Sequence, residues 1–413
     1  LKKVPKIGTA MVDTMRRTKS SIKQLIIPGM LFENMGLTYL GPVDGHNMRQ
    51  MMKLFNEAKR VEGPVIVHVL TKKGKGYGPA SAHPDRFHGT GPFDIRTGKP
   101  LEKKVCPGYT DIFSRKLAAL GEQNKKLTAI TAAMPDGTGL VEFSRKFPER
   151  FFDVGIAEEH AVALISGIAK NGGKPVFGTN ATFIQRTYDQ VSQDLCINNN
   201  SGTILLGYAS VAGLNDVTHL GIFAISAFKN IPNLVILAPT NKKEYLSMLD
   251  WSIEQNEHPV MILIPGNGVI NDNREAQSDY SNINKYKLEQ KGEKVAIIAC
   301  RDFYQIGESA AKLIEEKLGF KPTLINPRFL TGFDEELLDS LKEDHELVIT
   351  LEDGIVDGGF GEMISRYYGL DDIKVKNLGM KKEFYDRYDA QELLENLGIT
   401  PEKIMEEAKR YTK

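Results

Sequence analysis

The stretch VAIIACRDFYQIGESAAKLIEE, residues 295–316, contains the two patterns that decide the fold. Residues 295–299 form a short, continuous apolar run, which is typical of a strand buried on both faces of a parallel sheet. Residues 304–316 then place apolar side chains at helical spacing. A strand followed directly by a helix is the repeating unit of doubly wound α/β folds, so this stretch predicts that class.

The same alternation recurs along most of the chain. Further apolar runs predict strands at residues 65–70, 127–131, 203–207, 234–238, 260–264 and 347–351. Helical spacing predicts helices at residues 111–120, 158–170, 184–197, 242–255 and 359–367. We therefore expect an α/β fold with doubly wound, mostly parallel sheets.

Composition narrows the class of protein further. The chain has 413 residues, of which 41% are hydrophobic and 26% are charged, close to the average for soluble globular proteins. At about 150 residues per domain, this length suggests two or three domains. The 53 basic and 53 acidic residues cancel, so no net charge attracts nucleic acid or an anionic membrane. Because no run of eighteen apolar residues exists, we expect no membrane-spanning helix.

The cysteines and the chain start indicate the cellular context. Cys106, Cys196 and Cys300 lie far apart, which excludes a disulfide framework or a zinc ribbon and fits the reducing cytosol. The first residue is Leu1 rather than Met, and no signal-peptide pattern follows it. We therefore expect a piece of a longer, cytoplasmic protein.

Two polar segments without a clean period, residues 83–107 and 271–292, are expected to be linkers. They divide the chain into residues 1–107, a middle α/β domain at 108–270 and a smaller α/β domain at 293–413. Residues 1–59 suggest two helices around a turn, followed by the single strand at 65–70. Because one strand cannot make a sheet, this first segment is predicted to be the tail of a domain.

Two loops carry candidate phosphate-binding and proton-transfer groups. TKKGKGYGP, residues 71–79, combines glycines with three lysines, which suits a loop beside a diphosphate, although a solvated basic turn fits its composition equally well. The next loop contains His83 and His88. Histidine can transfer protons near neutral pH, but an exposed loop histidine without a function is the commoner case.

Three segments of the middle domain offer further candidates. DVGIAEEHAV, residues 153–162, places Glu158 in the first turn of a helix, where it either complements the helix dipole or meets a ligand. TNATFIQRTYDQ, residues 179–190, offers the Phe183 ring as a stacking face, and Arg186 and Asp189 have the spacing of an ordinary helix ion pair. In AGLNDVTHLG, residues 212–221, His219 either contacts a substrate or caps the following helix.

Taken together, these segments resemble the 1-deoxy-D-xylulose-5-phosphate synthase family. The segments that carry the resemblance occur in collinear order: GPVDGHN (41–47), TKKGKGYGP (71–79), FHGTGPFD (87–94), VEFSRKFPERFFDVGIAEEHAV (141–162), TFIQRTYDQV (182–191) and THLGIFAIS (218–226). LEDGIVDGGFG, residues 351–361, is the best match in the final part.

The resemblance implies a fold, a reaction and partners. Members of the family are transketolase-like, cytoplasmic homodimers that use thiamine diphosphate and Mg²⁺ and serve isoprenoid and thiamine biosynthesis. They decarboxylate pyruvate and transfer the two-carbon unit to glyceraldehyde 3-phosphate. The implied domains are a remnant of the diphosphate-binding domain with its linker (1–107), a pyrimidine-binding domain (108–270), a linker (271–292) and a transketolase-like C-terminal domain (293–413).

The resemblance also implies which residues hold the cofactor. Glu158 matches the glutamate that hydrogen-bonds the aminopyrimidine ring, where a carboxyl able to give a proton to the ring nitrogen promotes activation of the thiazolium carbon. Phe183 matches the aromatic residue that stacks on that ring. Tyr77 matches a tyrosine near the cofactor, and Lys73 matches a lysine that faces the phosphates.

Catalytic roles follow in the same way. Glu158, His88 and His219 are the implied catalytic residues, because the two histidines match groups that contact the bound intermediate or the acceptor. Arg186 and Asp189 match the QRxYDQ segment of the family, for which we expect a largely structural role.

The sequence departs from the family at two places. The metal-binding GDG motif, followed at a distance by Asn, belongs upstream of Leu1, so we assign no metal ligand in this chain. The acceptor-phosphate residues also differ: Asn180, Tyr208 and Asn215 replace a tyrosine, an arginine and an aspartate, and LIPGN from Leu263 replaces RYPRG. Loss of the arginines weakens phosphate recognition.

These departures leave alternatives open. One is a paralogous transketolase-like enzyme that uses a different aldehyde acceptor. Another is a non-catalytic subunit that dimerises or completes a site on another chain. The β subunit of a 2-oxo-acid dehydrogenase is disfavoured by the motifs within residues 1–100.

Overall fold

The computed structural model describes residues 30–101, 108–264, 266 and 268–412. Contacts divide the chain into two units, Leu1–Val105 and Cys106–Lys413. Expectations that concern residues 1–29, the end of the first linker and Cys106 lie outside the described residues.

The first unit contains one small parallel sheet. Its described elements are α2 (Met30–Asn34), β1 (Thr38–Asp44), α3 (Met48–Ala58), β2 (Val65–Leu70) and α4 (Gly78–Ala82). β1 and β2 pair in parallel across the α3 connection. The expectation of a lone strand is therefore wrong, because residues 38–44 form a second strand. Gly41 and Pro42 interrupt its apolar pattern, as both residue types are uncommon in strands.

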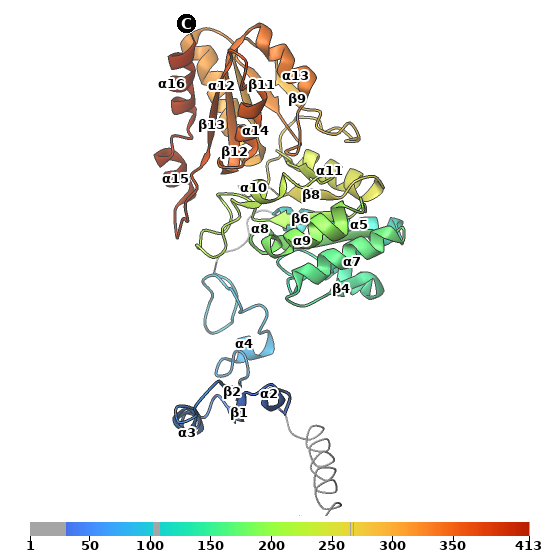
Figure 1. Cartoon of the computed structure of the whole chain (residues 1–413), viewed down its shortest axis with the longest axis vertical. Helices are drawn as coiled ribbons and strands as arrows, with labels where there is room; N and C mark the ends of the chain where they lie inside the picture. Colours follow the sequence, from blue (N-terminus) through green and yellow to red (C-terminus); the bar gives the residue numbers. More distant parts are fainter. Residues whose placement is uncertain (1–29, 102–107, 265, 267, 413) are drawn as a thin grey trace, which may run out of the picture. The chain divides into compact units, whose positions relative to one another are not determined.

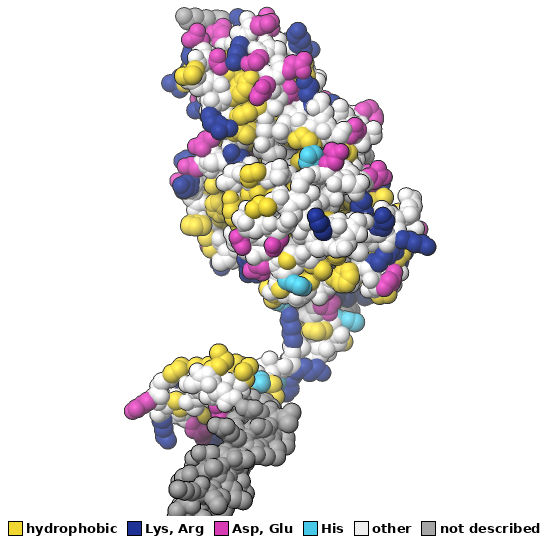
Figure 2. Space-filling model, turned by 45° about the vertical axis from the view of Figure 1, so that its right-hand side comes forward, with side chains coloured by type: hydrophobic (Ala, Val, Ile, Leu, Met, Phe, Trp, Pro, Cys, Tyr) yellow, Lys and Arg dark blue, Asp and Glu magenta, His cyan; other side chains and the backbone are white. Residues whose placement is uncertain are grey.

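This first unit keeps much of its apolar surface exposed. On α3, Met48, Met52 and Phe55 are exposed, and Ala80 and Gly98 are the only buried residues between 31 and 101. Figure 2 shows apolar side chains on the surface of this part of the chain. A two-stranded sheet is marginal by itself, so the described part of this unit lacks a core of its own.

The second unit begins with a six-stranded sheet in the order β4-β3-β5-β6-β8-β7, in which every pair is parallel. The strands are β3 (Leu127–Thr131), β4 (Phe151–Asp153), β5 (Lys174–Asn180), β6 (Thr203–Gly207), β7 (Val235–Leu237) and β8 (Val260–Leu263). Their helical connections are α5 (Tyr109–Gln123), α6 (Val141–Lys146), η1 (Pro148–Arg150), α7 (Glu158–Lys170), α8 (Ala181–Ile184), η2 (Gln185–Thr187), α9 (Tyr188–Gln190), η3 (Val191–Cys196), α10 (Ala224–Phe228) and α11 (Lys242–Glu254).

Side-chain alternation explains why helices cover both faces of this sheet. In β5, Val176 packs in the cluster formed with α5 and α11, whereas its neighbour Phe177 packs in the cluster formed with α7 and α10. Successive strand residues point to opposite faces, so a continuous apolar run buries both. The apolar runs of the sequence thus reflect a sheet between two helical layers.

A second sheet has the order β13-β12-β10-β11-β9, with β9 antiparallel at its edge. Its strands are β9 (Lys287–Gln290), β10 (Lys294–Ala299), β11 (Thr323–Asn326), β12 (His345–Ile355) and β13 (Lys374–Met380). The remaining elements are η4 (Arg301–Phe303), α12 (Tyr304–Leu318), α13 (Glu335–Ser340), η5 (Leu341–Glu343), α14 (Phe360–Tyr367), α15 (Ala390–Asn396) and α16 (Pro401–Tyr411). The apolar clusters place α12 and α16 on one face of this sheet and α13 and α14 on the other (Figure 1). The α/β fold class is confirmed.

Two expected segments differ in detail. Residues 184–197 do not form one helix but four short helical pieces that end in a π-helical turn, η3. Residues 271–292 are more than a connection, because they contribute β9 and bury Tyr280 and Tyr286.

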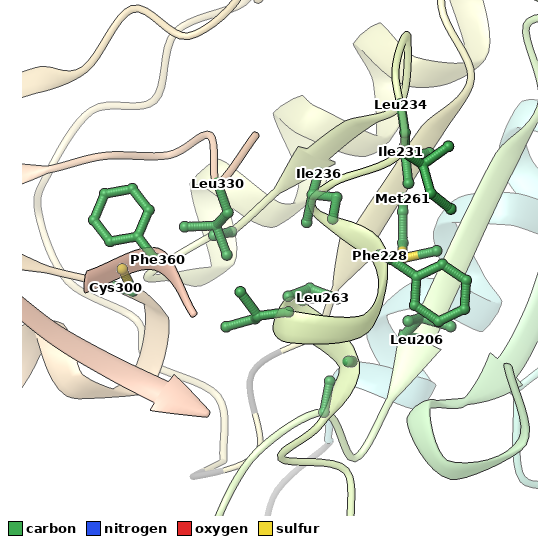
Figure 3. Packing of buried hydrophobic residues seen from close by; sticks show 14 of the residues in the cluster. Leu206, Phe228, Ile231, Leu234, Ile236, Met261, Leu263, Cys300, Leu330 and Phe360 are labelled. Carbon is green, nitrogen blue, oxygen red and sulfur yellow. The ribbon is translucent and has the colours of Figure 1, made fainter. Parts of the chain in front are cut away.

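The two sheets of the second unit share one apolar core. Leu330 N–H donates to Ile236 O at 3.0 Å, and Ala238 N–H donates to Arg328 O at 2.8 Å. Figure 3 shows Leu330 near Ile236 and Leu263 within this shared cluster. The second sheet therefore supports the edge of the first.

Buried charges lie at the same junction. Arg301, fully buried, donates to the carbonyls of Ala209 and Ile264. Asp302 accepts from Ser210 Oγ at 2.9 Å and from Gly266 N–H at 2.7 Å. These side chains satisfy backbone groups at the ends of β6 and β8, because unpaired polar groups are costly in a core.

A second buried acid lies within strand β12. Glu352 is fully buried and accepts N–H groups of Phe360 at 2.7 Å and Gly361 at 3.0 Å, at the start of α14. Burial raises the pKa of Glu352 to about 8, and burial likewise raises the pKa of Asp353 to about 7. Folding therefore favours the protonated form of both acids. The stability that this contributes is fully present below the unfolded pKa, and it is lost as pH rises through the folded values.

We predict that Glu352→Gln makes stability less dependent on pH. As pH rises from about 4.5 to 8, the wild-type protein should lose up to about 1.4 kcal/mol of stability per pH unit for each of the two acids, and the variant should lose less because only Asp353 still titrates. Thermal unfolding at several pH values measures this, with exposed Glu346→Gln as the control. Parallel pH profiles for wild type and Glu352→Gln would contradict the account.

Candidate active site

Glu158 is the first residue of α7, just beyond the carboxyl end of β4. Its exposed fraction is 2%, whereas Glu159 is only partly buried. Ligands of open α/β sheets bind at the carboxyl ends of the strands, so the position is suited to a ligand-binding group. An acid that only complemented the helix dipole would need no such burial, because that effect operates at the surface.

The partner of this buried carboxylate is Arg186. Arg186 Nη1 lies 3.1 Å from Glu158 Oε2 and 3.3 Å from Oε1. The Arg186 side chain comes from η2 and is 47% exposed. The sequence spacing predicted an ion pair between Arg186 and Asp189 within one helix. Arg186 instead pairs with Glu158, which lies 28 residues earlier in the sequence. Sequence spacing alone gave no sign of the pair.

Two rings complete what we call the carboxylate cluster: Glu158, Arg186, Phe183 and His219. The Arg186 Cζ lies 5.7 Å from the centroid of the Phe183 ring, and the Phe183 and His219 ring centroids are also 5.7 Å apart, edge to face. Arg186 thus joins Glu158 to Phe183, and Phe183 in turn contacts His219.

The loop around His219 is held by local hydrogen bonds. Thr182 Oγ1 donates to Thr218 O at 3.2 Å, which ties this loop to α8. His219 Nδ1 lies 3.6 Å from Asp216 Oδ1. The hydroxyl of Thr218, which donates to Asp216, is the main cause of a lowered pKa of that acid. The same Thr218 hydroxyl lies 2.7 Å from His219 Nδ1, so it links the His219 ring to Asp216.

The candidate residues of the first unit form a cluster of their own. Lys73 Nζ lies 2.7 Å from His88 Nδ1. The Tyr77 ring lies 5.6 Å from that of Phe87, and its buried hydroxyl has no hydrogen-bond partner among the described residues. His83 ends α4. Lys73 and His88 are thus in direct contact.

A cavity of about 170 Å³ lies at the carboxyl ends of β5, β6 and β8. Asn180 and Tyr208, two of the positions that depart from the family, line it together with Thr110 and Thr179. Within the part of the chain that the structure describes, the buried Thr179 Oγ1 has no hydrogen-bond partner, so a polar ligand would satisfy it. Sequence reasoning missed Thr110 and Thr179 because a threonine carries no distinctive signal.

Of the other departing positions, some line this cavity and some do not. Asn215 Nδ2 donates to Tyr388 O at 2.9 Å, and Leu263 is buried in the core. Pro265 and Asn267 lie outside the described residues. Gly266 lines the cavity and is held by Asp302.

Comparison with known proteins identifies the relatives of this chain. The sequence profile described as 1-deoxy-D-xylulose-5-phosphate synthase matches residues 1–71, the transketolase pyrimidine binding domain matches 107–268, and the transketolase C-terminal domain matches 284–404. The 1-deoxy-D-xylulose-5-phosphate synthase of Lachnoclostridium phytofermentans is 42% identical over 412 residues, which are 98% of this chain and 65% of that protein. The chain belongs to the 1-deoxy-D-xylulose-5-phosphate synthase family. The family predicted from the motifs is thus confirmed.

Other members of the family and solved structures agree. The synthase of Clostridium tetani is 40% identical and is covered to the same 65%. This chain therefore spans about two thirds of the length of the curated relatives that it matches. A split gene transketolase, described as an inactive beta4 tetramer, has a TM-score of 0.64 at 22% identity, covering 74% of this chain and 98% of that one. A Pichia stipitis transketolase with sedoheptulose 7-phosphate has a TM-score of 0.61 at 16% identity, covering 75% of this chain and 46% of that one. These structures establish a transketolase-like fold.

Membership of this family implies thiamine diphosphate as the cofactor. The carboxylate cluster fits the aminopyrimidine ring of that cofactor. A buried acid beside an aromatic face has the two groups that an aminopyrimidine ring requires, a hydrogen-bonding carboxyl and a stacking surface. The described residues contain no group of three or more side chains suited to a metal ion. They also contain no helix long and apolar enough to cross a membrane.

We predict that Asp302→Ala destabilises the wall of the cavity. The substitution removes the acceptor of the Ser210 hydroxyl and of the Gly266 N–H. It also removes one of the acidic side chains near the buried Arg301. Unfolding free energy should fall by about 2–4 kcal/mol in urea titrations. The exposed acid Asp372 provides the control, since its replacement by Ala should change stability by less than about 0.5 kcal/mol. Equal effects of the two substitutions would contradict the assignment.

Proposed function

We propose that this chain carries part of the active site of a thiamine-diphosphate-dependent 1-deoxy-D-xylulose-5-phosphate synthase. The reaction decarboxylates pyruvate and transfers the two-carbon unit to an aldehyde, which is glyceraldehyde 3-phosphate in the family. The observation that carries the proposal is the buried carboxylate of Glu158 within contact range of an arginine and near an aromatic ring. Mg²⁺, a homodimeric assembly, a cytoplasmic location and roles in isoprenoid and thiamine biosynthesis are parts of the same proposal.

Glu158 acts on the proton balance of the cofactor. Bound thiamine diphosphate supplies a thiazolium carbon that adds to 2-oxo acids and accepts the electrons released on decarboxylation. The Glu158 carboxyl would hold a proton at one Oε atom, facing the pyrimidine nitrogen. Its burial keeps water from competing for that hydrogen bond.

The neighbouring residues take complementary roles. Phe183 would offer its ring face to the pyrimidine, and His219, hydrogen-bonded to Thr218, would exchange a proton with the carbonyl oxygen of the substrate. Lys73 and Tyr77 would bind the cofactor, and His88, beside Lys73, would contact the substrate. The domain division at residues 107, 270 and 292 belongs to this proposal as well.

The comparisons favour this function over a paralogous enzyme with another acceptor, because relatives at 37–42% identity carry the synthase name. Asn180 and Tyr208, which line the cavity, are neutral and differ from the family's acceptor-phosphate residues. The identity of the acceptor is therefore the part of the reaction to assay first. Comparing glyceraldehyde 3-phosphate with unphosphorylated glyceraldehyde in steady-state assays does this. Turnover with the unphosphorylated aldehyde alone would contradict the proposed acceptor.

We predict that Glu158→Gln abolishes most turnover while leaving the fold intact. The amide cannot give a proton to the ring nitrogen, so kcat should fall by about 10²–10⁴-fold. Product formation from pyruvate and glyceraldehyde 3-phosphate, measured with the enzyme as its gene encodes it, tests this. Glu159→Gln, one residue along the same helix, is the matched control and should retain activity. A Glu158→Gln enzyme with wild-type kcat would exclude the proposed role.

A further inference from the structure

Arg186 makes two contacts that a bound aminopyrimidine ring would also make. Its Nη1 donates to both oxygens of Glu158, at 3.1 and 3.3 Å. Its guanidinium carbon lies 5.7 Å from the centroid of the Phe183 ring. One planar nitrogen-bearing group thus meets both the acid and the aromatic residue of the cluster.

The chemistry of the two groups is closely alike. A guanidinium is flat and delocalised, donates N–H bonds in its own plane, and stacks on aromatic rings. An aminopyrimidine is also flat, carries an amino group beside ring nitrogens, and would use its edge toward the acid and its face toward the ring. The two groups are therefore alternatives for the same partners.

We propose that Arg186 is a positioning residue that occupies the pyrimidine site until the cofactor displaces it. This inference rests on the proposed function, since it concerns the same carboxylate. In the free protein, Arg186 pairs with the buried charge of Glu158, which would be costly to leave without a partner. When the cofactor binds, its ring takes over the carboxyl and the arginine moves toward solvent.

The surroundings of Arg186 allow such an exchange. Its side chain is 47% exposed, whereas that of Glu158 is 3% exposed. In the part of the chain that the structure describes, both hydrogen bonds of the Arg186 side chain go to Glu158, and only Nη1 takes part. A long side chain with one anchored nitrogen can rotate away without unfolding the helix that carries it.

The exchange has a measurable consequence for affinity. If the cofactor must displace Arg186, it can bind only the fraction of protein in which Arg186 has left Glu158. The apparent affinity for the cofactor is then the intrinsic affinity multiplied by that fraction. Removing the guanidinium should therefore tighten binding. If Arg186 instead stayed on Glu158 in the complex, removing its guanidinium would weaken cofactor binding, because the Glu158 carboxyl would lose the contact that positions it.

The test compares thiamine diphosphate binding, with Mg²⁺ present, by calorimetry for wild type, Arg186→Met and Arg186→Lys. We expect Kd to fall by about 5–30-fold for Arg186→Met, and to stay near the wild-type value for Arg186→Lys, which keeps a cation. Arg145→Met, at an exposed arginine of α6, is the control and should bind as wild type does. Unchanged or weaker binding by Arg186→Met would overturn the exchange.

A second readout needs no cofactor and separates this inference from the proposed function. Thermal unfolding of Arg186→Met, Glu158→Gln and the double variant forms a double-mutant cycle, and non-additive shifts in Tm are expected if the pair exists in the free protein. Additive shifts would overturn the exchange even if the cofactor binds. Absence of cofactor binding in wild type and Arg186→Met alike would overturn the proposed function, and the exchange with it.

Discussion

A carboxylate buried at the end of a parallel sheet requires a partner, and this requirement organises the candidate site. Glu158 reaches its position because β4 ends at Asp153 and α7 begins five residues later, directing the first helical turn inward. A charge in that position is stable only with a cation or a hydrogen-bonding ligand. Arg186 supplies the first, and an aminopyrimidine ring would supply the second.

The rest of the second unit fixes the elements that carry these groups. The shared apolar core joins the two sheets through Ile236 and Leu330, and the buried side chains of Arg301 and Asp302 bind backbone groups at the strand ends. The edge of the sheet where ligands bind is therefore supported by the C-terminal sheet. A rigid scaffold of this kind can hold a catalytic acid within the small tolerances that proton transfer requires.

Much of the fold could be read from the sequence because both faces of the sheets are buried. The strands β2, β3 and β6 coincide with their predicted ranges, since each is a continuous apolar run. β5 was missed because Pro175 and Gly178 interrupt its run, and β13 because lysines alternate with its apolar residues. A single helix was predicted for residues 184–197, but the segment includes a π-helical turn, which the periodicity of apolar residues does not reveal.

The site was predictable in part for a similar reason. Motif resemblance pointed to Glu158, Phe183 and His219, and the structure brings these residues into one cluster. The contact of Arg186 with Glu158 could not be foreseen, because it depends on how α7 and η2, whose residues are 28 positions apart, meet at the sheet edge. Contacts of that kind follow from topology rather than from local pattern.

The most direct test of the account is a crystal structure of the protein with thiamine diphosphate and Mg²⁺. The account predicts a Glu158 oxygen within hydrogen-bonding distance of a pyrimidine nitrogen, the Phe183 ring facing the pyrimidine, and the Arg186 guanidinium withdrawn from the carboxylate. A cofactor bound away from Glu158, or one bound while the Glu158–Arg186 pair remains closed, would contradict it.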